Sequence, residues 1–143
     1  MIRFPLFRLG SAAACLALSA TALAADPRPA FTPPSAASLP DTEFGKIVRQ
    51  GEQIFLHTPQ MAGKFVGNDL NCASCHLDAG RRPDSAPMWA AYVLYPAYRA
   101  KNEHVNTLAE RLQGCFRFSM NGKAPAADDP TLTALQSLSL IHI

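Results

Sequence analysis

The chain has 143 residues, of which 13 are Lys or Arg, 11 are Asp or Glu, 48% are hydrophobic and four are Cys. This length fits one compact domain with a targeting segment and excludes two sizeable domains. The nearly balanced charge argues against a nucleic-acid binder, and 8 Gly and 12 Pro are too few for a fibrous or fully disordered chain.

The N-terminus has the pattern of a secretory signal peptide. Arg3 and Arg8 form a basic start, the apolar stretch 9–18 follows, and 22–24 (Ala-Leu-Ala) provides a small-x-small cleavage site. The apolar stretch is shorter than the roughly 20 residues that a spanning helix needs. A cleaved signal peptide over 1–24 is therefore favoured over a retained anchor, which predicts a periplasmic protein with no membrane attachment.

Cleavage at this site would leave an odd number of cysteines. It would remove Cys15 and leave Cys72, Cys75 and Cys115 in a chain with equal numbers of basic and acidic residues. In an oxidising compartment, an odd number of thiols leaves one without a disulfide partner. The cysteines therefore require another role.

The residues before the cysteine pair predict a leader, a helix and a loop. Residues 25–40 hold five prolines and no helical periodicity, which indicates an extended leader. Asp41 or Thr42 is expected to cap a helix over 42–57, because apolar residues recur there at i, i+3, i+4 and i+7. The glycines and asparagines of 63–71 then predict a loop.

The residues after the pair predict a second loop over 80–87 and an aromatic-rich stretch over 88–98. From Asn102 to about Met120 the apolar pattern is helical again, and Asn121-Gly122 suits a left-handed helix C-terminus. One face of this predicted helix carries Val105, Leu108, Leu112, Cys115 and Phe116.

The end of the chain predicts a last helix that is cut short. Asp129 and Pro130 are typical of an N-cap and a first helical position. Only about seven residues follow before the apolar finish, whereas globular helices run about 8–20. That finish, LSLIHI, resembles a translated sequencing adaptor, so 138–143 is expected to be a non-native tail. The predicted folded domain is 41–137.

The sequence Cys72-Ala73-Ser74-Cys75-His76 is C-x-x-C-H, the attachment signature of c-type haem. Two thiols on a tight turn can form thioethers with one porphyrin, and the adjacent His can donate a ring nitrogen to its iron. A thioredoxin-like pair would need strand–helix alternation, and a zinc site would need a second Cys/His pair; neither pattern is found. The motif therefore predicts covalent haem c on Cys72, Cys75 and His76.

The sixth iron ligand decides what such a haem can do. Methionine gives a saturated electron carrier of higher potential, whereas a thiolate lowers the potential. Met88, His104, Cys115 and Met120 are the downstream candidates. Residue chemistry favours a methionine over Cys115, which can also be a small hydrophobe on the helix face.

The stretch from Arg81 to Lys123 holds seven cations and three acidic residues. Haem propionates can pair with some of this charge, and the remainder can focus a small dianion toward the haem. The alternative is a solvated face with Glu103 and Glu110 paired along the helix. The cations are Arg81, Arg82, Arg99, Lys101, Arg111, Arg117 and Lys123.

Three strings, NCASCHLDAG (71–80), APMWAAYVLYPAYRAKN (86–102) and ERLQGCFRFSMNG (110–122), closely resemble the N-terminal haem domain of the thiosulfate dehydrogenases, which are periplasmic dihaem c-type cytochromes. The resemblance implies an all-α, cytochrome c-like fold and the coupling of two thiosulfates to tetrathionate. It implies His76 and the thiolate of Cys115 as iron ligands, and Ser119 as a pocket residue. Arg99 and Arg111 are the basic residues expected to hold the anion.

The family also carries a second CxxCH domain, so the resemblance predicts that this chain is a fragment of the enzyme. Electrons would leave through that second haem domain or an acceptor cytochrome. Two other functions stay open at this point. One is a non-catalytic mono-haem electron carrier with Met120 or Met88 as sixth ligand, and the other is a Cys-ligated haem subunit of a sulfur-oxidation complex.

Overall fold

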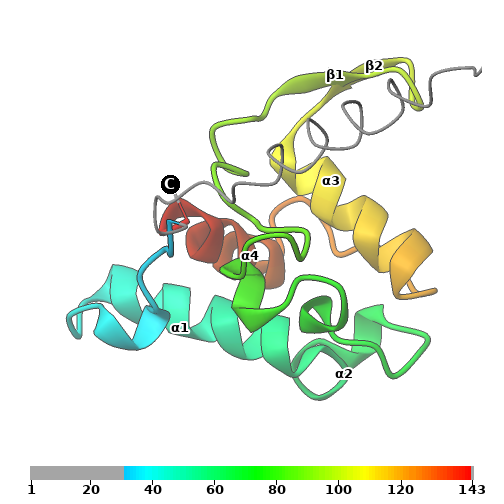
Figure 1. The fold of residues 1–143 in the computed structure, drawn as a ribbon. Coiled ribbons are helices and arrows are strands. Elements are labelled where there is room, and N and C mark those ends of the chain that lie inside the picture. The colour runs from blue at the N-terminus through cyan, green and yellow to red at the C-terminus, as the bar shows by residue number, and fades with distance from the viewer. Residues whose placement is uncertain (1–30, 143) are drawn as a thin grey trace, which may run out of the picture. The chain divides into compact units, whose positions relative to one another are not determined.

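A computed structural model describes residues 31–142 of the chain, and Figure 1 shows that they form a helical domain with one small hairpin. The signal peptide predicted over 1–24 lies outside the described residues. None of the helices within 31–142 has the length and apolar character that crossing a bilayer requires. The helices are α1 (Glu43–Leu56), α2 (Thr58–Met61), α3 (Leu108–Gly114) and α4 (Pro130–Leu140), and the strands are β1 (Ala97–Arg99) and β2 (His104–Asn106).

Helix α1 confirms the helix predicted over 42–57. Thr42 is its N-cap, and the Thr42 hydroxyl oxygen accepts a hydrogen bond from the Gly45 N–H at 3.1 Å. Most of the apolar stripe read from the sequence is buried, with Val48 and Ile54 in the core, whereas Phe44 at its N-terminal end is 45% exposed. Pro59 then occupies the first turn of α2, where its missing N–H costs nothing.

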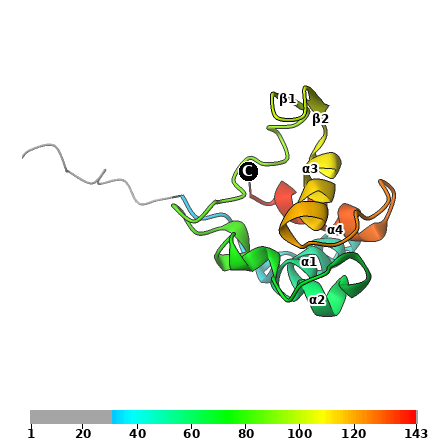
Figure 2. The ribbon, with the colours of Figure 1, turned by 90° about the vertical axis from the view of Figure 1, so that its right-hand side faces the viewer.

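The core lies where α1 packs against α4 (Figures 1 and 2). The two helices approach closely at Gly51, where an added Cβ would lie 2.1 Å from the Ala134 carbonyl oxygen. Leu132, Leu135 and Leu138 of α4 are buried around this crossing. The absence of a side chain at Gly51 therefore sets the distance between the helices.

The helix predicted from Asn102 begins later, so that prediction was wrong for residues 102–107. Val105 lies in β2 and is 57% exposed, and α3 starts after Thr107. Thr107 and Glu110 form a reciprocal capping box, in which the Glu110 carboxylate accepts from the Thr107 N–H at 2.6 Å. This box satisfies two backbone donors at once, which a cap at Asn102 would not do. The same hydrogen bonds lower the pKa of Glu110.

The strands pair antiparallel, with Tyr98 opposite Val105 and Arg99 opposite His104. The hairpin lies beyond the N-terminal end of α3 (Figures 1 and 2). Apart from this small sheet, the domain is built from helices and turns, which confirms the all-α class.

Helix α4 begins as predicted and continues further than expected. The Asp129 carboxylate accepts from the Thr131 N–H at 2.8 Å, which makes Asp129 the N-cap. The helix runs through 138–140, because Leu138 and Ser139 turn toward the core and are buried there. His142 is also buried, and burial lowers its pKa.

Candidate functional site

An open cavity of about 150 Å³ lies between the CxxCH segment and α3. Its walls are mainly apolar, with several sulfur-bearing and basic side chains among them. The residues that line it are Phe55, Leu70, Asn71, Cys72, Cys75, His76, Met88, Ala91, Tyr95, Leu108, Arg111, Leu112, Cys115, Phe116, Ser119, Met120 and Leu135.

A tight turn brings the CxxCH side chains to one wall of this cavity. The turn is tied to the start of α2, where the Thr58 N–H donates to Asn71 Oδ1 at 2.8 Å and the Cys72 N–H donates to Thr58 Oγ1 at 3.1 Å. Cys72 and Cys75 are free thiols rather than a disulfide. Two free thiols beside a cavity are what thioether attachment requires.

His76 is oriented by a backbone carbonyl. Its Nδ1 lies 2.5 Å from the Ala86 oxygen. A carbonyl oxygen accepts only, so Nδ1 carries the hydrogen and Nε2 keeps its lone pair. A metal-binding histidine is commonly fixed in this way, with one ring nitrogen held and the other available. Ala86 was not identified from the sequence, because a backbone acceptor leaves no side-chain signal.

Cys115 faces the same cavity and contacts a cation. Arg111 Nη1 donates to Cys115 Sγ at 3.1 Å. Burial raises the pKa of the Cys115 thiol, and the charge and hydrogen bond of Arg111 oppose that rise. Burial also raises the pKa of Cys72. Arg111 is therefore positioned to stabilise a thiolate on Cys115.

The helix that carries Cys115 widens at that residue. Residues Cys115–Ser119 form a π-helical turn, in which the Met120 N–H donates to the Cys115 oxygen at 2.9 Å. Such turns are rare and are frequently found at functional sites. Arg111, Cys115 and Ser119, spaced four residues apart, all line the cavity. The Asn68 side chain anchors the end of this turn by donating to the Ser119 oxygen at 3.0 Å.

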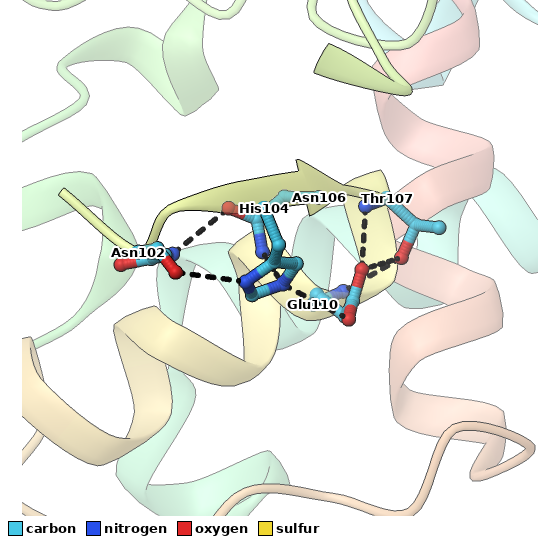
Figure 3. A network of polar contacts seen from close by, with 5 residues as sticks. All are labelled: Asn102, His104, Asn106, Thr107 and Glu110. Carbon is cyan, nitrogen blue, oxygen red and sulfur yellow. Dashed lines mark hydrogen bonds and ion pairs between the residues drawn. The ribbon is translucent and has the colours of Figure 1, made fainter. Parts of the chain in front are cut away.

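Three of the four candidate sixth ligands line the cavity: Met88, Cys115 and Met120. His104 does not. It lies in a polar network with Asn102, Asn106, Thr107 and Glu110 (Figure 3).

Figure 3 shows how this network joins the hairpin to α3. Asn106 Nδ2 donates to His104 Nε2 at 2.9 Å, and His104 Nδ1 donates to the backbone oxygen of Asn102 at 3.1 Å. Asn102 Nδ2 donates to Asn106 Oδ1 at 2.8 Å, and His104 Nε2 lies 3.5 Å from Glu110 Oε1. His104 thus has a structural role in the hairpin.

The predicted anion-binding residues differ in position. Arg111 and Ser119 line the cavity, and Arg99 does not. Arg99 lies in β1, and its Nη2 donates to the Tyr95 hydroxyl oxygen at 2.9 Å. Its guanidinium also lies 4.9 Å from the centre of the Tyr95 ring. Tyr95, which lines the cavity, was not identified as a site residue from the sequence.

These residues fit a covalently attached haem. Two free thiols and a histidine with an available Nε2 share a wall of the cavity, and Leu108, Leu112 and Phe116 provide apolar surface for a porphyrin. Within residues 31–142 no group of three or more His, Cys, Asp or Glu side chains is arranged to hold a metal ion. The donors present suit an iron that already has porphyrin nitrogens.

The cytochrome c domain model of SoxA/TsdA proteins matches residues 51–140. Thiosulfate dehydrogenase from Thiomonas intermedia is 60% identical over 109 residues, which cover 76% of this chain and 35% of that protein. Thiosulfate dehydrogenase from Stutzerimonas stutzeri is 52% identical over 109 residues, covering 76% of this chain and 36% of that protein. The chain therefore spans about a third of the length of these relatives.

A solved structure is similar as well. Thiosulfate dehydrogenase (TsdBA) from Marichromatium purpuratum, in its "as isolated" form, matches with a TM-score of 0.74 and 50% identity, over 78% of this chain and 26% of that one. Because the family model covers more than half of the residues, and the cavity carries the donors for thioether-linked haem, the chain belongs to the SoxA/TsdA cytochrome c domain family and its cofactor is covalent haem c.

Proposed function

We propose that this chain is the active-site haem domain of a periplasmic thiosulfate dehydrogenase, which couples two thiosulfates into tetrathionate. The observation that carries the proposal is the Arg111–Cys115 contact of 3.1 Å in the same cavity as the CxxCH residues. A thiol beside a guanidinium is suited to nucleophilic sulfur chemistry. Relatives named thiosulfate dehydrogenase support this choice of substrate.

Cys72 and Cys75 would carry the thioethers, and His76 and Cys115 would hold the iron, with Met120 as the alternative to Cys115. When bound, the haem supplies a one-electron acceptor whose potential a thiolate ligand lowers. Arg111 attracts the thiosulfate dianion, and the Ser119 hydroxyl offers it a hydrogen-bond donor. Arg99 is outside the cavity lining, and its side chain donates a hydrogen bond to the hydroxyl oxygen of Tyr95.

The reaction can be written on Cys115 with balanced atoms and electrons. In the first step the Cys115 thiolate and the outer sulfur of thiosulfate form an S–S bond, and the two electrons released go one at a time to the redox partner. A second thiosulfate then attacks the same outer sulfur. The new S–S bond completes tetrathionate, the bond to Cys115 breaks, and its thiolate is restored. No net proton is taken up or released.

The redox partner is proposed to be a second haem domain or an acceptor cytochrome. The proposed organisation places the signal peptide at 1–24, a leader at 25–40 and the haem domain at 41–137, with 138–143 as a non-native tail. The periplasmic location depends on that signal peptide, and thioether-linked haem is consistent with export.

A mono-haem electron carrier is the second candidate function, because Met88 and Met120 also line the cavity. A methionine ligand would saturate the iron and give the haem the higher potential of an electron carrier. A third candidate, a Cys-ligated subunit of a sulfur-oxidation complex, would need a partner protein for activity.

Product stoichiometry tests these candidates. The full-length holoprotein is mixed with thiosulfate and an oxidised one-electron acceptor. We expect one tetrathionate for every two thiosulfates consumed, with two acceptors reduced. Acceptor reduction without tetrathionate would instead indicate an electron carrier. Activity that appears only after a sulfur-oxidation partner protein is added would indicate the subunit function.

A further inference from the structure

Tyr95 brings a second hydroxyl group to the cavity, in addition to that of Ser119. It is half-buried, and its oxygen accepts a hydrogen bond from Arg99 Nη2 at 2.9 Å. A phenol has one hydrogen to donate, and among the described residues the Tyr95 hydroxyl makes no donated hydrogen bond. This hydrogen is therefore free for an acceptor inside the cavity.

The Arg99 contact makes Tyr95 a stronger donor. A guanidinium that donates to the phenol oxygen draws electron density from the O–H bond, and hydrogen bonds in series strengthen one another. The guanidinium also lies over the ring, 4.9 Å from its centre, which places positive charge next to the phenol. Such a hydroxyl is suited to bind an anion.

The hairpin fixes this pair relative to α3. Arg99 lies opposite His104 in the β1–β2 register, and His104 contacts Asn106 and Glu110. Glu110 in turn caps α3, the helix that carries Arg111 and leads into Cys115. Figure 3 shows this connection between the hairpin and the start of α3. Arg99 is thus held where its guanidinium reaches Tyr95 and not the cavity itself.

Arg111 is the one cationic side chain among the described residues that lines the cavity, and it also donates to Cys115. A dianion bound next to Cys115 therefore needs further donors. We propose that Tyr95 contacts bound thiosulfate and donates its hydroxyl hydrogen to a sulfonate oxygen, while Arg99 is a positioning residue that acts through Tyr95. This inference depends on the proposed thiosulfate dehydrogenase function.

A double-mutant cycle in the full-length holoprotein tests this assignment. Tyr95→Phe keeps the ring and removes the donor, so KM for thiosulfate is expected to rise about tenfold with kcat changed less than about twofold. Arg99→Gln is expected to have a similar effect. The double variant should also show about a tenfold rise rather than about a hundredfold, because Arg99 acts through Tyr95.

Tyr98→Phe is the matched control, because this tyrosine lies in β1, is 63% exposed and does not line the cavity. It is expected to leave KM unchanged. The haem absorbance spectrum should be the same in all variants, which separates an anion contact from a contact with the haem.

An unchanged KM in Tyr95→Phe, in a protein that forms tetrathionate, would overturn this inference and leave the proposed function standing. Multiplicative effects of the two substitutions would show that Arg99 binds the anion directly, and a shifted haem spectrum without a KM change would assign Tyr95 to the haem. Both outcomes would also overturn the inference. A parent holoprotein that does not respond to thiosulfate would overturn it together with the proposed function.

Discussion

Replacing Cys115 with alanine is expected to lower thiosulfate turnover by more than about a thousandfold, while haem stays covalently attached. The substitution removes the sulfur that Arg111 contacts at 3.1 Å, and with it the nucleophile of the proposed reaction. Cys72, Cys75 and His76 stay in place, so attachment does not depend on this residue. Tetrathionate formation and a haem stain of the denatured protein are the two measurements.

Cys72→Ala provides the opposite pattern as a control, because it removes a predicted thioether and should impair haem attachment. Circular dichroism shows whether each variant is folded. Turnover near the parent level in folded, haem-loaded Cys115→Ala would remove Cys115 from the reaction. A haem stain that is unchanged by Cys72→Ala would count against the attachment role of the CxxCH residues.

Substitution of Gly51 is expected to destabilise the packing of α1 against α4. An added Cβ would lie 2.1 Å from the Ala134 oxygen and 2.8 Å from its carbonyl carbon, so α1 and α4 would have to move apart. Overpacking of this kind costs about 1–3 kcal/mol, and occasionally more, in the free energy of unfolding. Helix propensity alone would favour alanine by about 1 kcal/mol. Gly51→Ala should therefore be destabilising, and Gly51→Val more so.

Gly63→Ala is the matched control, because a Cβ at Gly63 meets nothing within 4 Å. Replacing a glycine where the backbone permits it stabilises by about 0.4–1 kcal/mol. Urea unfolding of the holoproteins measures both changes. A Gly51→Ala variant as stable as Gly63→Ala would contradict the close helix crossing seen here.

The sequence predicts those features whose causes are local. Thr42 and Asp129 are N-caps that accept hydrogen bonds from nearby backbone N–H groups. The spacing of apolar residues in α1 predicts which face of the helix is buried. The CxxCH motif likewise predicts haem attachment from residues that are close together in the sequence. These elements and the attachment residues can therefore be predicted from the sequence alone.

The hairpin could not be predicted in the same way. Strand pairing between 97–99 and 104–106 depends on a network that joins Asn102, Asn106 and Glu110 to His104. Val105 matches the helical apolar period of 108–116, so the pattern extended the helix too far. The Thr107–Glu110 capping box was the signal in the sequence that marked the true start.

The site was predicted in part. Arg111, Cys115 and Ser119 share the cavity because residues four positions apart lie on the same face of α3 and of the π turn that continues it. The contact of Arg99 with Tyr95 depends on the fold of the hairpin. The hydrogen bond between His76 Nδ1 and the Ala86 backbone oxygen depends on the loop that follows the CxxCH motif. Neither contact leaves a pattern in the amino-acid sequence.

The absorption and electron paramagnetic resonance spectra of the ferric holoprotein test most directly whether Cys115 binds the haem iron together with His76. We expect the low-spin signature of histidine–thiolate ligation in the parent, replaced by a histidine–methionine signature in Cys115→Met. A parent that already shows histidine–methionine ligation, and loses it in Met120→Leu, would contradict the account.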